Sequence, residues 1–203
     1  MWLLSATSGA VDAFVFLCVG HVFAGVMTGN LVLLGASAAG AGEDGVAWRA
    51  TTALVAYGGG AALGAWLAEA RRLPAPVTLL IEAVLLAGAA ALWGPGLIVS
   101  DGDRLGLLSI TALAMGIQGR VRVTPTNYFT GTLTALIARA ALRAPRPGDG
   151  WAIGRVVGVV AGAGATALTV RFWPGAAAAV GAVLAVCALL LETAPGGRRG
   201  RKP

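Results

Sequence analysis

The chain has 203 residues, of which 57% are hydrophobic and 12% are charged, and its net charge is +6 at pH 7. Because a soluble domain carries about a quarter charged residues, this composition leaves no room for a separate soluble domain and predicts a membrane protein with several crossings. The basic residues lie at the ends of apolar segments, without interleaved aromatic residues. That distribution indicates membrane topology and argues against nucleic-acid binding.

The first half of the chain begins with an apolar unit that is broken by polar residues. Residues 2–19 form an apolar run with Asp12 near its middle, and a second run over 22–41 contains the polar sequence Met27–Asn30, the first knot. The whole unit is too long for one straight helix across about 30 Å and slightly short for two full spans. We therefore expect a full helix followed by a re-entrant or half-length helix. Two spans follow, over residues 46–69 and 76–93.

The second half repeats this plan. It begins with a broken unit over residues 105–142, interrupted by Arg120, Arg122 and Pro125. Within this unit Phe129–Thr132 forms a second knot. At an offset of 102, residues 28–39 and 130–141 are identical at seven of twelve positions, which predicts an internal repeat. Two spans follow, over residues 151–170 and 175–191.

Charged residues between the spans predict the orientation. By the positive-inside rule, the basic loops and the tail lie in the cytoplasm: Arg71 and Arg72, residues 139–150 and residues 196–203. The acidic loops at Glu43–Asp44 and Ser100–Asp103 then lie outside. This arrangement requires an odd number of net crossings from each broken unit.

We therefore expect an all-α polytopic membrane protein of two inverted repeats with three net crossings each, both beginning with a broken or re-entrant helix unit. A single transmembrane domain is predicted over residues 1–195, with repeat 1 over about 2–93 and repeat 2 over about 105–192. A basic cytoplasmic tail over 196–203 follows it. The predicted location is the cell (inner or plasma) membrane, with both termini in the cytoplasm.

The two knots are the first candidate site. A polar, glycine-broken element at corresponding places in two halves of a membrane chain points to the binding site of a transporter. The backbone N–H groups of a half-helix, with hydroxyl and amide side chains, suit an anion or a carbonyl oxygen. The alternative is helix capping and close packing without a ligand. The six residues concerned are Thr28, Gly29, Asn30, Thr130, Gly131 and Thr132.

Asp12 is the sharpest single candidate. An ionisable group at mid-span costs about 2.5–3.5 kcal/mol on insertion scales and usually faces the interior of the bundle. It is predicted either to bind a proton or cation, or to be a hydrogen-bonded carboxylate that stabilises the interface between the repeats. Arg120 and Arg122, near Gln118 and Asn127, are candidate countercharges for Asp12 or for an anionic substrate group. Alternatively, Arg120 and Arg122 simply lie at the border of the membrane.

Other residues receive structural predictions. Arg49, Glu82 and Arg155 lie a turn or two inside their spans, where snorkelling to the interface is expected and a functional role is the alternative. His21 is the sole histidine and is expected to be a satisfied interfacial residue, with proton relay as the alternative. Glycines at helical spacing are predicted to form close-packing helix faces: Gly60, Gly64, Gly158 and Gly162.

The motifs of the two broken units resemble those of the YoaK family, small bacterial inner-membrane proteins with a domain of unknown function. The resemblance rests on residues 5–35, SATSGAVDAFVFLCVGHVFAGVMTGNLVLLG, and on the second-half stretch GIQGRVRVTPTNYFTGTLT. The family typically carries Asn after the Gln of this stretch, where the chain has Gly119. The resemblance implies a polytopic α-helical membrane protein of about six spans and no established substrate.

We expect a membrane transporter or channel for a small solute or ion, with a polar site near the bilayer midplane formed by the two knots. The alternative is a non-transporting integral membrane scaffold, assembly partner or sensor. Enzyme motifs such as HExxH, GxSxG and the P-loop are absent from the sequence, so no catalytic residue, metal or cofactor is predicted. The expected partners are the lipid bilayer and an unidentified small molecule or ion, and the protein is expected to be a monomer or homodimer.

Overall fold

The computed structural model describes residues 2–120 and 129–194. Within these ranges the secondary structure is helical, without strands. The α-helices are α1 (Trp2–Phe14), α2 (Met27–Ala38), α3 (Val46–Ala65), α4 (Ala75–Trp93), α5 (Asp101–Arg120), α6 (Phe129–Ala141), α7 (Asp149–Phe172) and α8 (Ala179–Thr193). Short π-helical or 3₁₀ segments are η1 (Val15–Gly20), η2 (Trp66–Ala70) and η3 (Pro174–Ala176). Three features predicted from the sequence lie outside the described residues: Arg122, Asn127 and the tail 196–203.

Four segments are long and apolar enough to cross a membrane. They are Trp2–Gly20, Ala75–Trp93, Asp149–Phe172 and Pro174–Thr193. Each coincides with a span expected from the sequence. Helices α3 and α5 have 20 residues each, about 30 Å of helix, but are not among these four. Helix α5 carries charged residues in its first and last turns.

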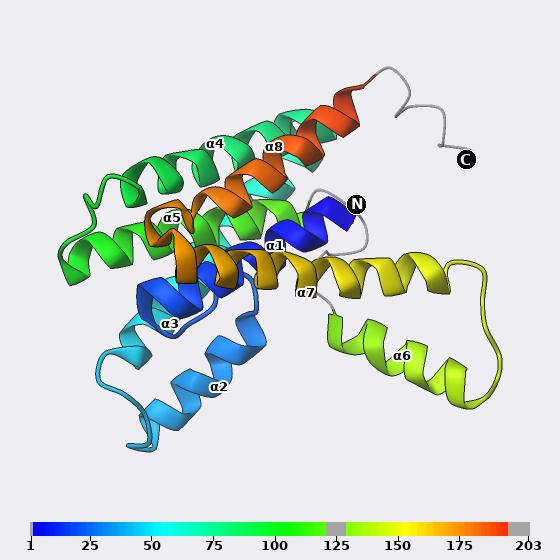
Figure 1. Ribbon diagram of the computed structural model, residues 1–203, viewed down its shortest axis with the longest axis horizontal. Coiled ribbons are helices and arrows are strands. Elements are labelled where there is room, and N and C mark those ends of the chain that lie inside the picture. The colour runs from blue at the N-terminus through cyan, green and yellow to red at the C-terminus, as the bar shows by residue number, and fades with distance from the viewer. Residues whose placement is uncertain (1, 121–128, 195–203) are drawn as a thin grey trace.

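The long helices pack in pairs around a core that α1 and α5 share. Helix α1 contacts α7 and α8, helix α5 contacts α3 and α4, and α4 contacts α8. In Figure 1, α1 and α5 lie between the α4–α8 pair and the helices α3 and α7. Most of α1 is buried, as is the second half of α5, so these two helices form the centre of the bundle.

Glycines allow two of these helix pairs to approach closely. A Cβ atom at Gly60 of α3 would overlap the carbonyl oxygen of Leu113, and one at Gly116 of α5 would overlap that of Tyr57. In the α1–α7 pair, a Cβ atom at Gly9 would overlap the carbonyl oxygen of Val159, and one at Gly162 would overlap that of Ala6. Two more predicted packing glycines also lie at these contacts, Gly64 against Ile117 and Gly158 against Trp2.

The first broken unit is a full-length helix followed by a half-length one, as its length predicted. The helix of α1 and η1 ends at Gly20, and His21 follows with a left-handed backbone (φ 57°). The chain then runs without helix to Val26, and α2 has only 12 residues, about 18 Å. Helix α6 in the second half has 13 residues. Neither short helix can cross about 30 Å of hydrocarbon by itself.

Candidate functional site

The first knot is held together by its own side chains. Asn30 is fully buried, and its side-chain amide forms two hydrogen bonds with the backbone of Phe23. Asn30 Oδ1 accepts from the Phe23 N–H at 2.9 Å, and Asn30 Nδ2 donates to the Phe23 carbonyl oxygen at 2.7 Å. Gly29 packs against the Phe23 ring, whereas the side chain of Thr28 is exposed. The polar groups of Asn30 are therefore occupied in fixing the break.

Asp12 holds the same break from the other side. Its carboxylate is 8% exposed and accepts a hydrogen bond from the Gly25 N–H at 2.7 Å. The N–H groups of Ala24 and Val26 also face this carboxylate. Successive backbone N–H groups form a concavity that binds anions, and here the chain's own carboxylate fills it. The geometry fits the structural alternative for Asp12.

Each knot begins a half-length helix that packs within its own half of the chain. Helix α2 packs against α3, and α6 packs against α7, so each half-length helix lies on the third helix of its own half. In the view of Figure 1, α2 and α6 diverge from each other, and their N-terminal ends, which carry the knots, are the ends that face each other. Helix α6 buries no residue, and its first residues include Thr130, Gly131 and Thr132. A polar site formed by both knots stays a prediction.

A different buried polar pair lies at the centre of the bundle. Glu82 of α4 is fully buried, and Gln118 of α5 is 1% exposed. Gln118 Nε2 donates to Glu82 Oε1 at 2.7 Å and to the carbonyl oxygen of Leu4 in α1 at 3.3 Å. The second carboxyl oxygen, Glu82 Oε2, is buried without a hydrogen-bond partner among the described residues. The pair therefore joins helices from both halves and leaves one buried acceptor unsatisfied.

The expectation that Glu82 snorkels to the membrane border was wrong. Glu82 is the eighth of the 19 residues of α4 and points into the bundle. The sequence carried a signal for this, because Glu82 follows Leu79 by three residues and precedes Leu86 by four. That spacing places it on the buried face of the helix. The distance of Glu82 from the helix end does not show which face of the helix carries it, so that distance alone leads to the wrong prediction.

The arginines also find partners other than those predicted. Arg120 pairs with Glu69, and both side chains are largely exposed, so Arg120 does not neutralise Asp12. The guanidinium of Arg155 lies beside two aromatic rings. It lies 5.6 Å from the ring centroid of Phe129 and 5.1 Å from that of Trp151, and the residue is 3% exposed.

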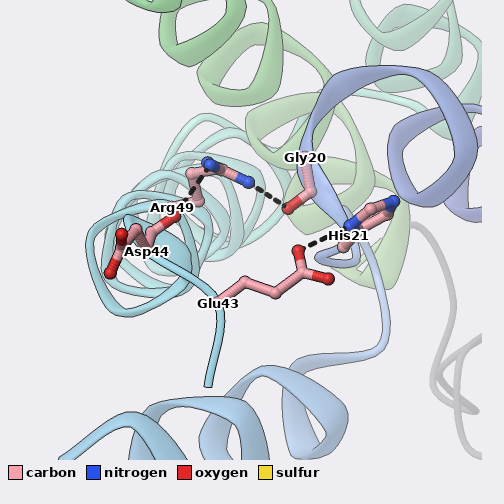
Figure 2. Close-up of polar contacts among 5 residues, drawn as sticks. All are labelled: Gly20, His21, Glu43, Asp44 and Arg49. Carbon is pink, nitrogen blue, oxygen red and sulfur yellow. Dashed lines mark hydrogen bonds and ion pairs between the residues drawn. The ribbon is translucent and has the colours of Figure 1, made fainter.

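At Gly20, where the first span ends, polar contacts connect the helix end and His21 to the loop at Glu43 and Asp44 (Figure 2). Arg49 donates from Nη1 to the carbonyl oxygen of Gly20 at 3.0 Å and from Nη2 to that of Asp44 at 3.1 Å. His21 Nδ1 lies 2.9 Å from Glu43 Oε2. This hydrogen bond and the charge of His21 hold the pKa of Glu43 below its usual value. Arg49 thus satisfies the Gly20 carbonyl group, which the end of the helix leaves free, and joins it to the loop at Asp44.

Comparison with known proteins agrees with this membrane architecture. A family model described as "Protein of unknown function (DUF1275)" matches residues 1–191. The chain belongs to the DUF1275 family. A curated relative, the UPF0700 transmembrane protein YoaK of Bacillus subtilis (strain 168), is 33% identical over 147 residues. The alignment covers 66% of this chain and 63% of that protein. No solved structure matches.

Membership of the DUF1275 family confirms the resemblance to the YoaK family and a multi-pass membrane protein. The chain spans less than two thirds of the length of the curated relative. Within the described ranges, no group of three or more His, Cys, Asp or Glu side chains is placed to hold a metal ion. Two carboxylates of this DUF1275 protein, those of Asp12 and Glu82, are buried within its helices.

Proposed function

We propose that this protein is a membrane transporter or channel for a small solute or ion, and that Glu82 and Gln118 form its proton- or cation-binding site. The observation that carries the proposal is the unpartnered carboxyl oxygen of Glu82, buried within a membrane-length helix. An intramembrane ionisable group usually marks an ion pathway or proton relay, because its burial is otherwise unfavourable. Coupling sites of transporters lie where structural repeats meet.

Each residue of the pair has a distinct role in this proposal. Glu82 Oε2 accepts a proton or coordinates a monovalent cation, which removes the unfavourable buried charge. Gln118 holds Oε1 by its amide N–H and fixes the carboxylate against α1 through the Leu4 carbonyl group. Asp12 and Asn30 hold the break in the first unit and position α2, rather than binding the solute directly.

The inverted-repeat architecture belongs to the same proposal. The contacts of α1 with α7 and α8 have counterparts in those of α5 with α3 and α4. The close contacts also correspond. At an offset of 102 residues, the counterparts of Tyr57 and Gly60 are Val159 and Gly162. At an offset of 107 residues, the counterparts of Ala6 and Gly9 are Leu113 and Gly116. These correspondences support two repeats with three crossings each. The half-length helices α2 and α6 are then re-entrant elements.

The scaffold alternative has its own support in the first knot. Asn30 and Asp12 are satisfied by backbone groups of the break, as expected if the knot only holds the fold. A scaffold does not require Glu82 to meet water, whereas a transporter does. Access of water to Glu82 therefore distinguishes the two functions.

Infrared spectroscopy of the protein in lipid vesicles tests this access. We expect the difference spectrum of wild type minus Glu82→Gln to contain a carboxyl signal that titrates with pH and shifts after transfer to D₂O. The matched control is Glu69→Gln, which removes an exposed glutamate, with size-exclusion chromatography to confirm folding. A Glu82 signal that neither titrates nor exchanges with D₂O would contradict transport and favour the scaffold.

A further inference from the structure

A second polar feature, separate from Glu82, is a pocket of about 330 Å³ at the end of the bundle where the first span stops. It lies between the first turns of α3 and α5. Both acidic loops contribute to it, through Asp44 and Asp101. The pocket is of the size class of small-molecule sites, at the lower end of their range of about 300–1,000 Å³.

The lining combines charges of both signs with an apolar base. Arg49 and Arg104 supply positive charge, and Asp44 and Asp101 supply negative charge. The accessible apolar surface comes from Trp48 and the half-buried Leu105, with the fully buried Leu108 behind them. A site with opposite charges over an apolar surface is complementary to a molecule that has both charges and an apolar group.

The charged side chains of the lining are available to a ligand. Among the described residues, the side chains of Asp44, Asp101 and Arg104 form no ion pair. Arg49 is held in place by the carbonyl groups of Gly20 and Asp44, as Figure 2 shows, and this uses two of its five N–H donors. The Arg49 guanidinium is therefore fixed before a ligand binds, and the Arg104 guanidinium can move to pair with a bound carboxylate.

We propose that this pocket binds a small zwitterion with an apolar side chain, such as an aliphatic α-amino acid. The carboxylate of the ligand is received by Arg104 and Arg49, because guanidinium and carboxylate groups match in shape and charge. Its ammonium group is received by Asp101 and Asp44, and its side chain packs toward Trp48 and Leu105. Binding of this ligand does not depend on the proposed function. Only a role of the pocket in admitting a transported solute rests on the proposed function.

Isothermal titration of the purified full-length protein tests the assignment with L-leucine and two analogues. The analogue 4-methylpentanoate lacks the ammonium group, and 3-methylbutylamine lacks the carboxylate. We expect L-leucine to bind and each analogue to bind at least about tenfold more weakly, because each leaves charged groups of the pocket without a partner. Arg104→Gln and Asp101→Asn are each expected to weaken leucine binding by about tenfold or more. Arg71→Gln, at the other end of α3, is the matched control and keeps wild-type affinity.

Three results would overturn the inference: no binding of L-leucine, equal binding of 4-methylpentanoate, or unchanged affinity in Arg104→Gln. The outcome is independent of transport. Leucine binding that depends on Arg104, in a protein whose Glu82 never exchanges with water, would support the pocket and contradict the proposed function. The opposite pair of results would remove the pocket and leave the Glu82 site standing.

Discussion

The two buried carboxylates differ in what surrounds them. Asp12 faces three consecutive backbone N–H groups, whereas Glu82 has the Gln118 amide on one oxygen and no partner on the other. A carboxylate that receives several N–H groups contributes to the fold. A buried one with an unsatisfied oxygen is maintained at an energetic disadvantage and is therefore a candidate for function.

This difference predicts opposite behaviour for two conservative substitutions. Asp12→Asn replaces a charged acceptor with an amide and turns an NH₂ group toward backbone N–H donors. We expect it to lower the free energy of unfolding by about 1–3 kcal/mol. Glu82→Gln removes a buried charge and is expected to change stability little. Thermal unfolding in detergent compares the two variants, and limited proteolysis between Gly20 and Met27 reports on the break. An Asp12→Asn protein as stable as wild type would contradict the capping role.

At the scale of the elements, glycines determine how closely the helices pack. Gly60 and Gly116 bring the α3 and α5 backbones into direct contact, and Gly9 and Gly162 do so for α1 and α7. Because hydrocarbon solvates apolar side chains as well as a protein interior does, helix association in a membrane depends on such close packing. The glycines at these crossings therefore differ from those that face outward on the same helices.

Helix α3 offers a test with an internal control. A methyl group at Gly60 would overlap the Leu113 carbonyl oxygen, whereas nothing lies within 4 Å of a Cβ built at Gly58. We expect Gly60→Ala to destabilise the protein by about 1–3 kcal/mol through overpacking. Gly58→Ala is expected to be neutral or to stabilise by up to about 1 kcal/mol through helix propensity. Thermal unfolding measures both variants, and equal effects would show that the α3–α5 contact is not close.

At the scale of the whole molecule, contacts between distant loops and helix ends join the two halves of the chain. Asp44 and Asp101, from the two acidic loops, line one pocket, and Trp93 Nε1 donates to the Pro174 carbonyl oxygen at 2.8 Å, which joins the α4–α5 connection to η3. Arg120 pairs with Glu69 where α3 and α5 end. From the charges of the loops we expect six crossings, with the acidic loops on one side of the membrane and the basic loops on the other.

Labelling of single cysteines tests this topology. In a background without Cys18 and Cys187, a membrane-impermeant thiol reagent is applied to right-side-out and inverted membrane vesicles. We expect Asp44→Cys and Asp101→Cys to react only in right-side-out vesicles, and Arg71→Cys and Arg143→Cys only in inverted ones. Two acidic loops that react from opposite sides would contradict both the inverted repeats and the shared pocket.

Much of the fold was readable from the sequence because it depends on neighbours along the chain. Apolar runs of membrane length predicted the four membrane-length segments. The length of the first unit predicted a full-length helix followed by a half-length one, now seen as α1 with η1 and then α2. The importance of Asp12 was also readable, because a carboxylate within an apolar run needs partners wherever the chain places them.

Only the tertiary structure decided which side chains meet. Glu82 and Gln118 are 36 residues apart, and Leu4 is 114 residues from Gln118, so their contact depends on how α1, α4 and α5 turn toward one another. The same holds for the two short helices, which share a sequence pattern and each pack on the third helix of their own half. Hydropathy is a property of a segment, whereas a binding site is set by the faces that distant helices present to each other. The packing of backbone against backbone at the glycines fixes those faces.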